Sequence, residues 1–188
     1  MRRIALLCLT LPLLCLALTV PAAAQPAPIE DYAPYQPATK CRPHAKPGAV
    51  LLQRFIVARF GGAPGRIGAR CDGTVSEHHE GRAIDWMVDA RTARGRAAAD
   101  RLFTWLFATD HAGDEDARAR RLGVMYVIWD DHIYSSYRGF EAEKYRNAAC
   151  RGKKLKRCSP TLRHRDHVHL SLTRAGGKGL TSWFVGRL

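Results

Sequence analysis

Residues 76–85 read SEHHEGRAID, and residues 164–169, near the other end of the chain, read HRDHVH. The first stretch offers His78 and Asp85 and the second offers His169, so two imidazoles and one carboxylate are available for a single metal ion. A catalytic zinc site typically takes three protein ligands and leaves a fourth position for water. The two stretches therefore predict a Zn²⁺ site made by His78, Asp85 and His169.

The spacing of the first stretch predicts a loop that leads into a strand. Gly81 lets the backbone turn between His78 and Asp85, so that both side chains can reach one ion. In a strand over residues 83–88, Asp85 would face the ion while its neighbours on either side face the core. In the second stretch, His167 and His169 stand two apart and point the same way on a strand, so one can bind the metal while the other contacts substrate or water.

The start of the chain has the pattern of a secretory signal peptide over residues 1–24. Arg2 and Arg3 are followed by an apolar run to Val20 and by small residues, Ala22–Ala24, before the expected cleavage site. The rival interpretation is a retained anchor, since the apolar run is at the short limit for a membrane span. We expect cleavage, and no membrane span in the mature chain.

The mature chain divides into two parts. Residues 25–40 hold four prolines and predict an extended linker with little to pack, and residues 41–188 predict one folded domain. Four cysteines follow the signal peptide, which in an exported chain predicts two disulfides with three possible pairings. The local choice is a Cys150–Cys158 bond, and Cys41 would then pair with Cys71.

The formal net charge of the chain is +13, and it becomes +11 once Arg2 and Arg3 leave with the signal peptide. Such a surface attracts polyanions. We expect peptidoglycan or another anionic cell-wall polymer as the partner, no specific nucleic acid, and a monomer that is secreted or held in the cell wall or periplasm. The basic run of residues 151–157 is either a solvated loop or a rim that contacts such a polymer. A surface that is merely rich in arginine is the alternative explanation of the charge.

Periodicity predicts an α+β domain with a mainly antiparallel sheet and flanking helices. Gly176 and Gly177 are expected to end the last strand, and Trp183 and Phe184 to pack the C-terminus down. The expected helices cover residues 48–60, 92–108 and, as a short turn, 117–122; the expected strands cover residues 66–70, 83–88, 124–129, 132–135 and 168–172.

The motif Ser-x-His-x-x-Gly-x-Ala-x-Asp, followed late in the chain by His-x-His, resembles the LAS superfamily of zinc proteins. That superfamily includes D-Ala-D-Ala carboxypeptidases, murein endopeptidases and the hedgehog signalling domain. The resemblance covers roughly residues 48–172 and implies a hedgehog/DD-peptidase-like fold. The five fixed positions of the first motif are Ser76, His78, Gly81, Ala83 and Asp85.

The resemblance also implies roles for single residues. His78, Asp85 and His169 would be the zinc ligands, Arg70 would stabilise the anionic transition state, and Asp166 would be the acid/base group. Two departures from the carboxypeptidases are an Asp where they commonly have Glu, and a Val before the last ligand where they have Trp. Exopeptidase and endopeptidase activity therefore both stay open, as does the choice between Asp166 and His167 as the base.

The function expected from these residues is that of a secreted zinc metallopeptidase acting on peptidoglycan stem or cross-bridge peptides. The alternative is a non-catalytic, zinc-stabilised module that binds the cell wall or a partner. The candidate acid/base residues at 166 and 167 favour the enzyme, and a secreted metal nuclease would rest on charge alone. His164 has no assigned role; Glu77 and Glu80 are expected to be solvated, and His44, His79, His111 and His132 to lie on the surface.

Overall fold

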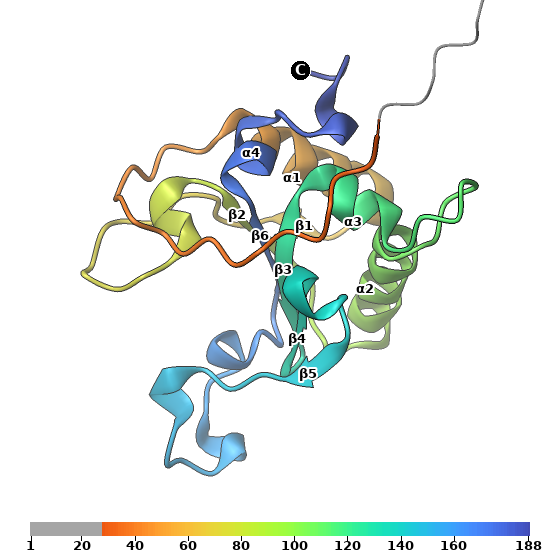
Figure 1. Cartoon of the computed structure of the whole chain (residues 1–188). Helices are drawn as coiled ribbons and strands as arrows, with labels where there is room; N and C mark the ends of the chain where they lie inside the picture. Colours follow the sequence, from red (N-terminus) through yellow and green to blue (C-terminus); the bar gives the residue numbers. More distant parts are fainter. Residues whose placement is uncertain (1–27) are drawn as a thin grey trace, which may run out of the picture.

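The computed structural model describes residues 28–188, so the expected signal peptide and the first residues of the expected linker lie outside the described part (Figure 1). Its centre is a six-stranded sheet of order β1-β2-β6-β3-β4-β5, in which every neighbouring pair is antiparallel. Helices flank this sheet, which confirms the predicted α+β fold. The strands are β1 (Ala63–Pro64), β2 (Ala83–Met87), β3 (Val124–Trp129), β4 (His132–Ser135), β5 (Ala142–Lys144) and β6 (Val168–Leu172).

The helices form close to where periodicity and capping residues place them. Pro47 stands in the first turn of α1, where its missing N–H costs nothing, and Gly61 follows the last residue. Thr92 caps α2 by accepting a hydrogen bond from the backbone N–H of Gly95. The helices are α1 (Pro47–Phe60), α2 (Ala93–Leu106), α3 (Ala117–Leu122) and α4 (Arg174–Lys178), and the 3₁₀ turn η1 covers Glu77–Glu80.

One face of the sheet carries the hydrophobic core. Ile84 and Trp86 of β2 are fully buried there and belong to one cluster with side chains of α1 and α2. The indole N–H of Trp86 donates to the carbonyl oxygen of Gly61 at 2.8 Å, which ties the strand to the end of α1. Asp85 therefore points to the opposite face, as the alternation of the strand predicted.

The chain before α1 crosses that opposite face and is not the loosely packed linker that its prolines predicted. Tyr32 donates from its hydroxyl to Asp116 at 2.8 Å, and the backbone N–H of the buried Ala33 donates to Ser136 at 2.7 Å. Tyr35 lies against Tyr126 of β3. In Figure 1 this segment is the orange trace that passes in front of β3. Proline-rich sequence here gives an extended segment that packs on the domain.

Residues 66–70 are not a strand, which corrects that expectation. The edge strand of the sheet here is β1, and the backbone leaves the sheet after two hydrogen bonds with Asp85. The N–H of Gly65 donates to the carbonyl oxygen of Asp85, and the N–H of Asp85 donates to the carbonyl oxygen of Arg66. A Cβ on Gly68 would lie 1.8 Å from the carbonyl oxygen of Pro43, so the chain passes here too close to another backbone for a regular strand. The segment instead runs over η1.

Gly176 and Gly177 lie inside α4 and do not end the last strand. β6 ends at Leu172, and Thr173 then caps α4 by accepting from the N–H of Gly176 at 3.0 Å. Glycine is needed because a Cβ on Gly176 would lie 2.5 Å from the carbonyl oxygen of Leu122. The expected packing of the C-terminus is confirmed, since Phe184 is buried and Trp183 lies against the core.

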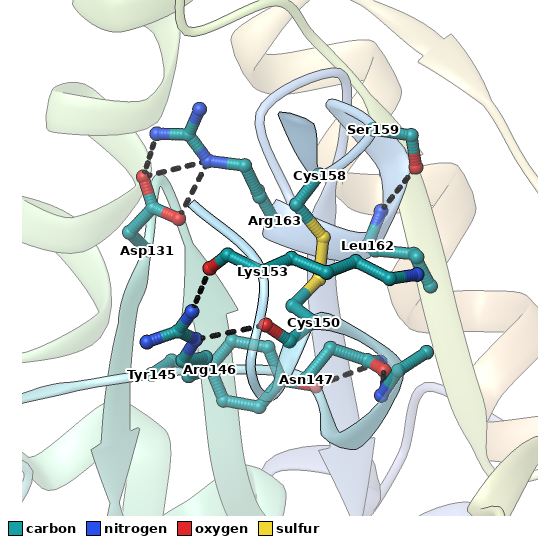
Figure 2. The surroundings of a disulfide bond; sticks show 11 residues. Asp131, Tyr145, Arg146, Asn147, Cys150, Lys153, Cys158, Ser159, Leu162 and Arg163 are labelled. Carbon is teal, nitrogen blue, oxygen red and sulfur yellow. Dashed lines mark hydrogen bonds and ion pairs between the residues drawn. A yellow bond between two sulfur atoms is a disulfide. The ribbon is translucent and has the colours of Figure 1, made fainter. Parts of the chain in front are cut away.

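Two disulfides join Cys41 to Cys71 and Cys150 to Cys158, which is the predicted pairing. Disulfides are compatible with an extracellular protein. Figure 2 shows the second bond, beside which Arg146 donates to the carbonyl oxygens of Cys150 and Lys153 and so braces the loop. None of the helices within residues 28–188 is both long and apolar enough to span a membrane.

Candidate metal centre

Three side chains bring their ligand atoms together on the face of the sheet opposite the hydrophobic core. His78 Nε2 lies 3.1 Å from Asp85 Oδ1 and 3.2 Å from His169 Nδ1, and His169 Nδ1 lies 3.1 Å from Asp85 Oδ1. Asp85 and His169 are direct neighbours across β2 and β6, and η1 supplies His78. These are the three residues that the sequence singled out, and all three are buried.

Local backbone chemistry explains how η1 delivers His78. Ser76 caps the turn, because its hydroxyl accepts from the backbone N–H of His78 at 3.3 Å. Gly81 ends the turn in the left-handed region, with φ of 66°. A Cβ at this position would lie 1.9 Å from the carbonyl oxygen of His44, so both the conformation and the close approach require glycine. The turn proposed for Gly81 from the sequence is thus present.

The hydrogen-bond partner of His78 fixes which ring nitrogen carries the proton. His78 Nδ1 lies 2.8 Å from the carbonyl oxygen of Ile67, and a carbonyl can only accept. Nδ1 is therefore the N–H of the neutral ring, and Nε2 presents its lone pair to Asp85 and His169. Such an outer partner is the usual way in which a protein orients a metal-binding histidine.

Three linked side chains, Ser171, Glu77 and Tyr126, do the same for His169. Ser171 Oγ lies 2.9 Å from His169 Nε2 and 3.5 Å from Glu77 Oε2, and Tyr126 also donates its hydroxyl to that oxygen. Because the carboxylate of Glu77 accepts the serine hydroxyl, the serine oxygen is left to accept the N–H at Nε2 of His169. His169 Nδ1 then presents a lone pair, and burial lowers the pKa of this ring, which keeps it neutral.

The donor set fits a zinc ion. With these tautomers, two imidazole lone pairs and a carboxylate oxygen face one another, an arrangement that a bound cation would stabilise. Ligand atoms about 2.0–2.1 Å from a tetrahedral zinc ion lie roughly 3.3 Å apart, close to the separations found here. Arg66 donates to the other carboxylate oxygen of Asp85 at 2.8 Å and leaves Oδ1 for the ion.

Of the two acid/base candidates, His167 lies next to this cluster and Asp166 lies on the far side of the His167 ring. His167 Nδ1 lies 2.7 Å from Asp166 Oδ1, and His167 Nε2 lies 3.6 Å from Asp85 Oδ1. Asp166 also accepts from the hydroxyl of Thr161 at 2.6 Å. β6 begins only at Val168, so both residues precede the regular strand. The imidazole is therefore the group that faces the cluster, and the carboxylate lies behind it.

The position of Arg70 gives no support for its expected role. Its side chain is exposed, and among residues 28–188 no hydrogen bond or ion pair joins it to the cluster. The arginine that contacts a ligand is Arg66, four residues earlier. The oxyanion role of Arg70 stays a prediction.

Several residues expected at the surface are buried around the centre. Glu77 and Glu80 were predicted to be solvated, but both are buried, and Arg82 lies between them at 3.8 Å and 2.7 Å. Although burial would raise the pKa of Glu80, hydrogen bonds from Thr39 and Arg82 lower it to about 2. His79 is buried against Asp72 rather than exposed.

His164, which had no assigned role, is buried between the rings of Tyr145 and His167. Burial lowers its pKa to about 2, which keeps the ring neutral. Its ring also lies near that of His169, so His164 packs directly beside the centre. No local sequence signal identified Glu77, Ser171 or His164, because their partners lie far along the chain.

Fold and site together define an α+β domain with a buried His-Asp-His group, able to hold a metal ion, on one face of an antiparallel sheet. Residues 41–156 match the family described as VldE, C-terminal domain, and this match covers more than half of the chain. The chain therefore belongs to that family. The matched region includes His78 and Asp85 and ends before His169. No curated protein matches the chain, and no solved structure matches it.

Proposed function

We propose that the protein is a secreted zinc metallopeptidase that hydrolyses peptide bonds in peptidoglycan stem or cross-bridge peptides. One observation carries the proposal: His78, Asp85 and His169 direct three ligand atoms to one point, with the histidine tautomers set by Ile67 and Ser171. The resemblance of residues 76–85 and 164–169 to LAS-superfamily motifs supplies the substrate class. The two disulfides agree with an exported protein.

The residues around the centre suit hydrolysis. A zinc ion held here would polarise a peptide carbonyl. It would also lower the pKa of a bound water molecule, so that the water can lose a proton and attack near neutral pH. His167 Nε2, which faces the cluster, would take one proton from the attacking water and return a proton to the amine that leaves when the C–N bond breaks. Asp166 would hold the N–H at Nδ1 of His167 and stabilise the ring while it is charged.

The positive charge of the chain would keep the enzyme on an anionic cell-wall polymer, as proposed from the sequence. One observation favours the alternative, a non-catalytic zinc-stabilised binding module: His78, Asp85 and His169 are only 2–6% exposed. A substrate must reach the centre for the peptidase proposal to hold.

A direct test incubates the purified mature protein with peptidoglycan, with and without a chelator, and looks for new peptide termini by mass spectrometry. The peptidase proposal expects new termini that disappear with chelator and return with added zinc. Binding to peptidoglycan without new termini would instead support the binding module.

A further inference from the structure

A second site lies at the start of β2, away from the metal ligands. The structure has a cavity of about 290 Å³ there, lined by six cationic side chains, one carboxylate and a threonine. Six cations and one carboxylate leave a net charge of +5 around this cavity. Its lining residues are Thr39, Lys40, Arg42, Lys46, Glu80, Arg82, Arg174 and Lys178.

In the part of the chain that the structure describes, only two of the six cations, Arg82 and Arg174, have a carboxylate partner. Arg82 donates to Glu80 at 2.7 Å and to the carbonyl oxygens of Leu172 and Gln36, so all its nitrogens are engaged. Arg174 lies 3.4 Å from the same carboxylate. For the other four cations, which are Lys40, Arg42, Lys46 and Lys178, no carboxylate partner occurs within residues 28–188.

Backbone contacts hold Arg42 and Lys46 beside the cavity. The N–H of Arg42 donates to the oxygen of His79, and the N–H of Lys46 donates to the oxygen of Gly81 at 2.8 Å. α1 begins directly after Lys46 and packs on α4 so closely that a Cβ on Gly48 would lie 2.1 Å from the oxygen of Gly176. That contact brings the start of α1, with the positive end of its dipole, beside the end of α4.

We infer that this cavity binds a phosphate group. Four unpaired cations around one cavity create a positive potential that attracts an anion. A doubly charged phosphate neutralises more of this charge than a single carboxylate does, and both lysine and arginine are common phosphate ligands. A volume of about 290 Å³ also leaves room for a glycerol or sugar attached to the phosphate.

The phosphate cavity does not depend on the peptidase proposal. Arg82 and Asp85 are three residues apart on one extended segment, about 10 Å at the usual rise per residue of a strand. None of the metal ligands lines the cavity. Binding at the cavity can therefore be measured whether or not the metal centre is active.

The test is isothermal titration calorimetry of the mature protein at fixed ionic strength, with three probes: inorganic phosphate, glycerol 3-phosphate and a poly(glycerol phosphate) polymer. The variant Lys46→Ala/Lys178→Ala removes two cavity charges. The matched control Lys153→Ala/Lys156→Ala removes two exposed charges from the disulfide loop and leaves the same net charge. Unfolding midpoints of both variants in chloride buffer check that they fold.

We expect the cavity variant to bind phosphate at least about tenfold more weakly than wild type, with the control variant unchanged. Phosphate should raise the unfolding midpoint of wild type and of the control, and not that of the cavity variant. Binding of the small probes alone assigns the site to a free phosphomonoester, and binding of the polymer assigns it to a phosphodiester chain. No binding by wild type, or an equal loss in both variants, overturns the inference.

Discussion

Asp85 and His169 lie directly opposite each other on β2 and β6, with Asp85 Oδ1 and His169 Nδ1 3.1 Å apart. This pairing makes the register of two central strands part of the metal centre. A shift of one residue would turn either side chain into the core, so the core packing of Ile84 and Trp86 also fixes the ligand geometry. His78 completes the set from η1.

The first prediction is that each ligand is needed for the metal. His78→Ala, Asp85→Ala and His169→Ala should each lose most of the bound zinc, because a three-ligand site has no protein group in reserve. The measurement is metal content per chain after dialysis. His44→Ala is the control, since His44 is exposed and should leave zinc content at the wild-type level. About one zinc per chain in all four variants would show that the cluster is not the site.

The second prediction concerns the serine that orients His169. Ser171→Ala removes the acceptor for the N–H at Nε2, so the ring no longer favours the tautomer that presents Nδ1 to the metal. Zinc affinity should fall about 10–100-fold, the usual effect of losing such a partner. A competition titration with a chromophoric chelator measures it.

Ser136→Ala is the matched control for this variant. Ser136 is also buried, is no part of the ligand set, and accepts a hydrogen bond from the backbone N–H of Ala33 at 2.7 Å. It should lose about 1 kcal/mol of stability and keep its zinc affinity. If Ser171→Ala binds zinc as tightly as wild type, Glu77 and Ser171 do not orient the ligand.

The parts of the site that follow from local pattern could be predicted from the sequence. Alternation along β2 placed Asp85 on the face opposite Ile84 and Trp86, and the structure has them so. The need for a turn between His78 and Asp85 identified Gly81. Each of these arguments involves residues within one short stretch.

The parts that depend on distant neighbours could not be predicted. Glu77 looked like a solvated charge, because nothing near it in the sequence shows that Tyr126 and Ser171 would bury it. The strand expected at residues 66–70 failed because Gly68 passes against Pro43, which is also distant in sequence. Contacts with distant segments of the chain decided both outcomes.

The third prediction ranks the two disulfides by the loops that they close. Cys150 and Cys158 are 8 residues apart, and Cys41 and Cys71 are 30 apart. Replacing the first pair by serine should cost about 2–3 kcal/mol of unfolding free energy, and replacing the second pair about 3–4 kcal/mol, by loop-closure entropy. Urea denaturation of the two double variants measures the difference. Non-reducing peptide mapping that joins Cys41 to Cys150 or Cys158 would contradict the pairing.

The last prediction asks which residue moves the proton in the proposed hydrolysis. The sequence left Asp166 and His167 open, with Asp166 slightly favoured by the resemblance. In the structure His167 Nε2 faces the cluster, and Asp166 is bound to the opposite ring nitrogen and to Thr161. We therefore expect His167 to carry the proton and Asp166 to act through it.

Both single variants should keep their zinc, because neither residue belongs to the ligand set. His167→Ala should lose at least about a hundredfold in turnover, the usual scale for removing an acid/base group, and Asp166→Asn should also lose turnover. The double variant decides between the two roles. If Asp166 acts only through His167, adding Asp166→Asn to His167→Ala should cause no further loss, because effects within one unit are not additive. A further large loss in the double variant, or near-wild-type turnover of His167→Ala with zinc bound, would give the proton-carrying role to Asp166.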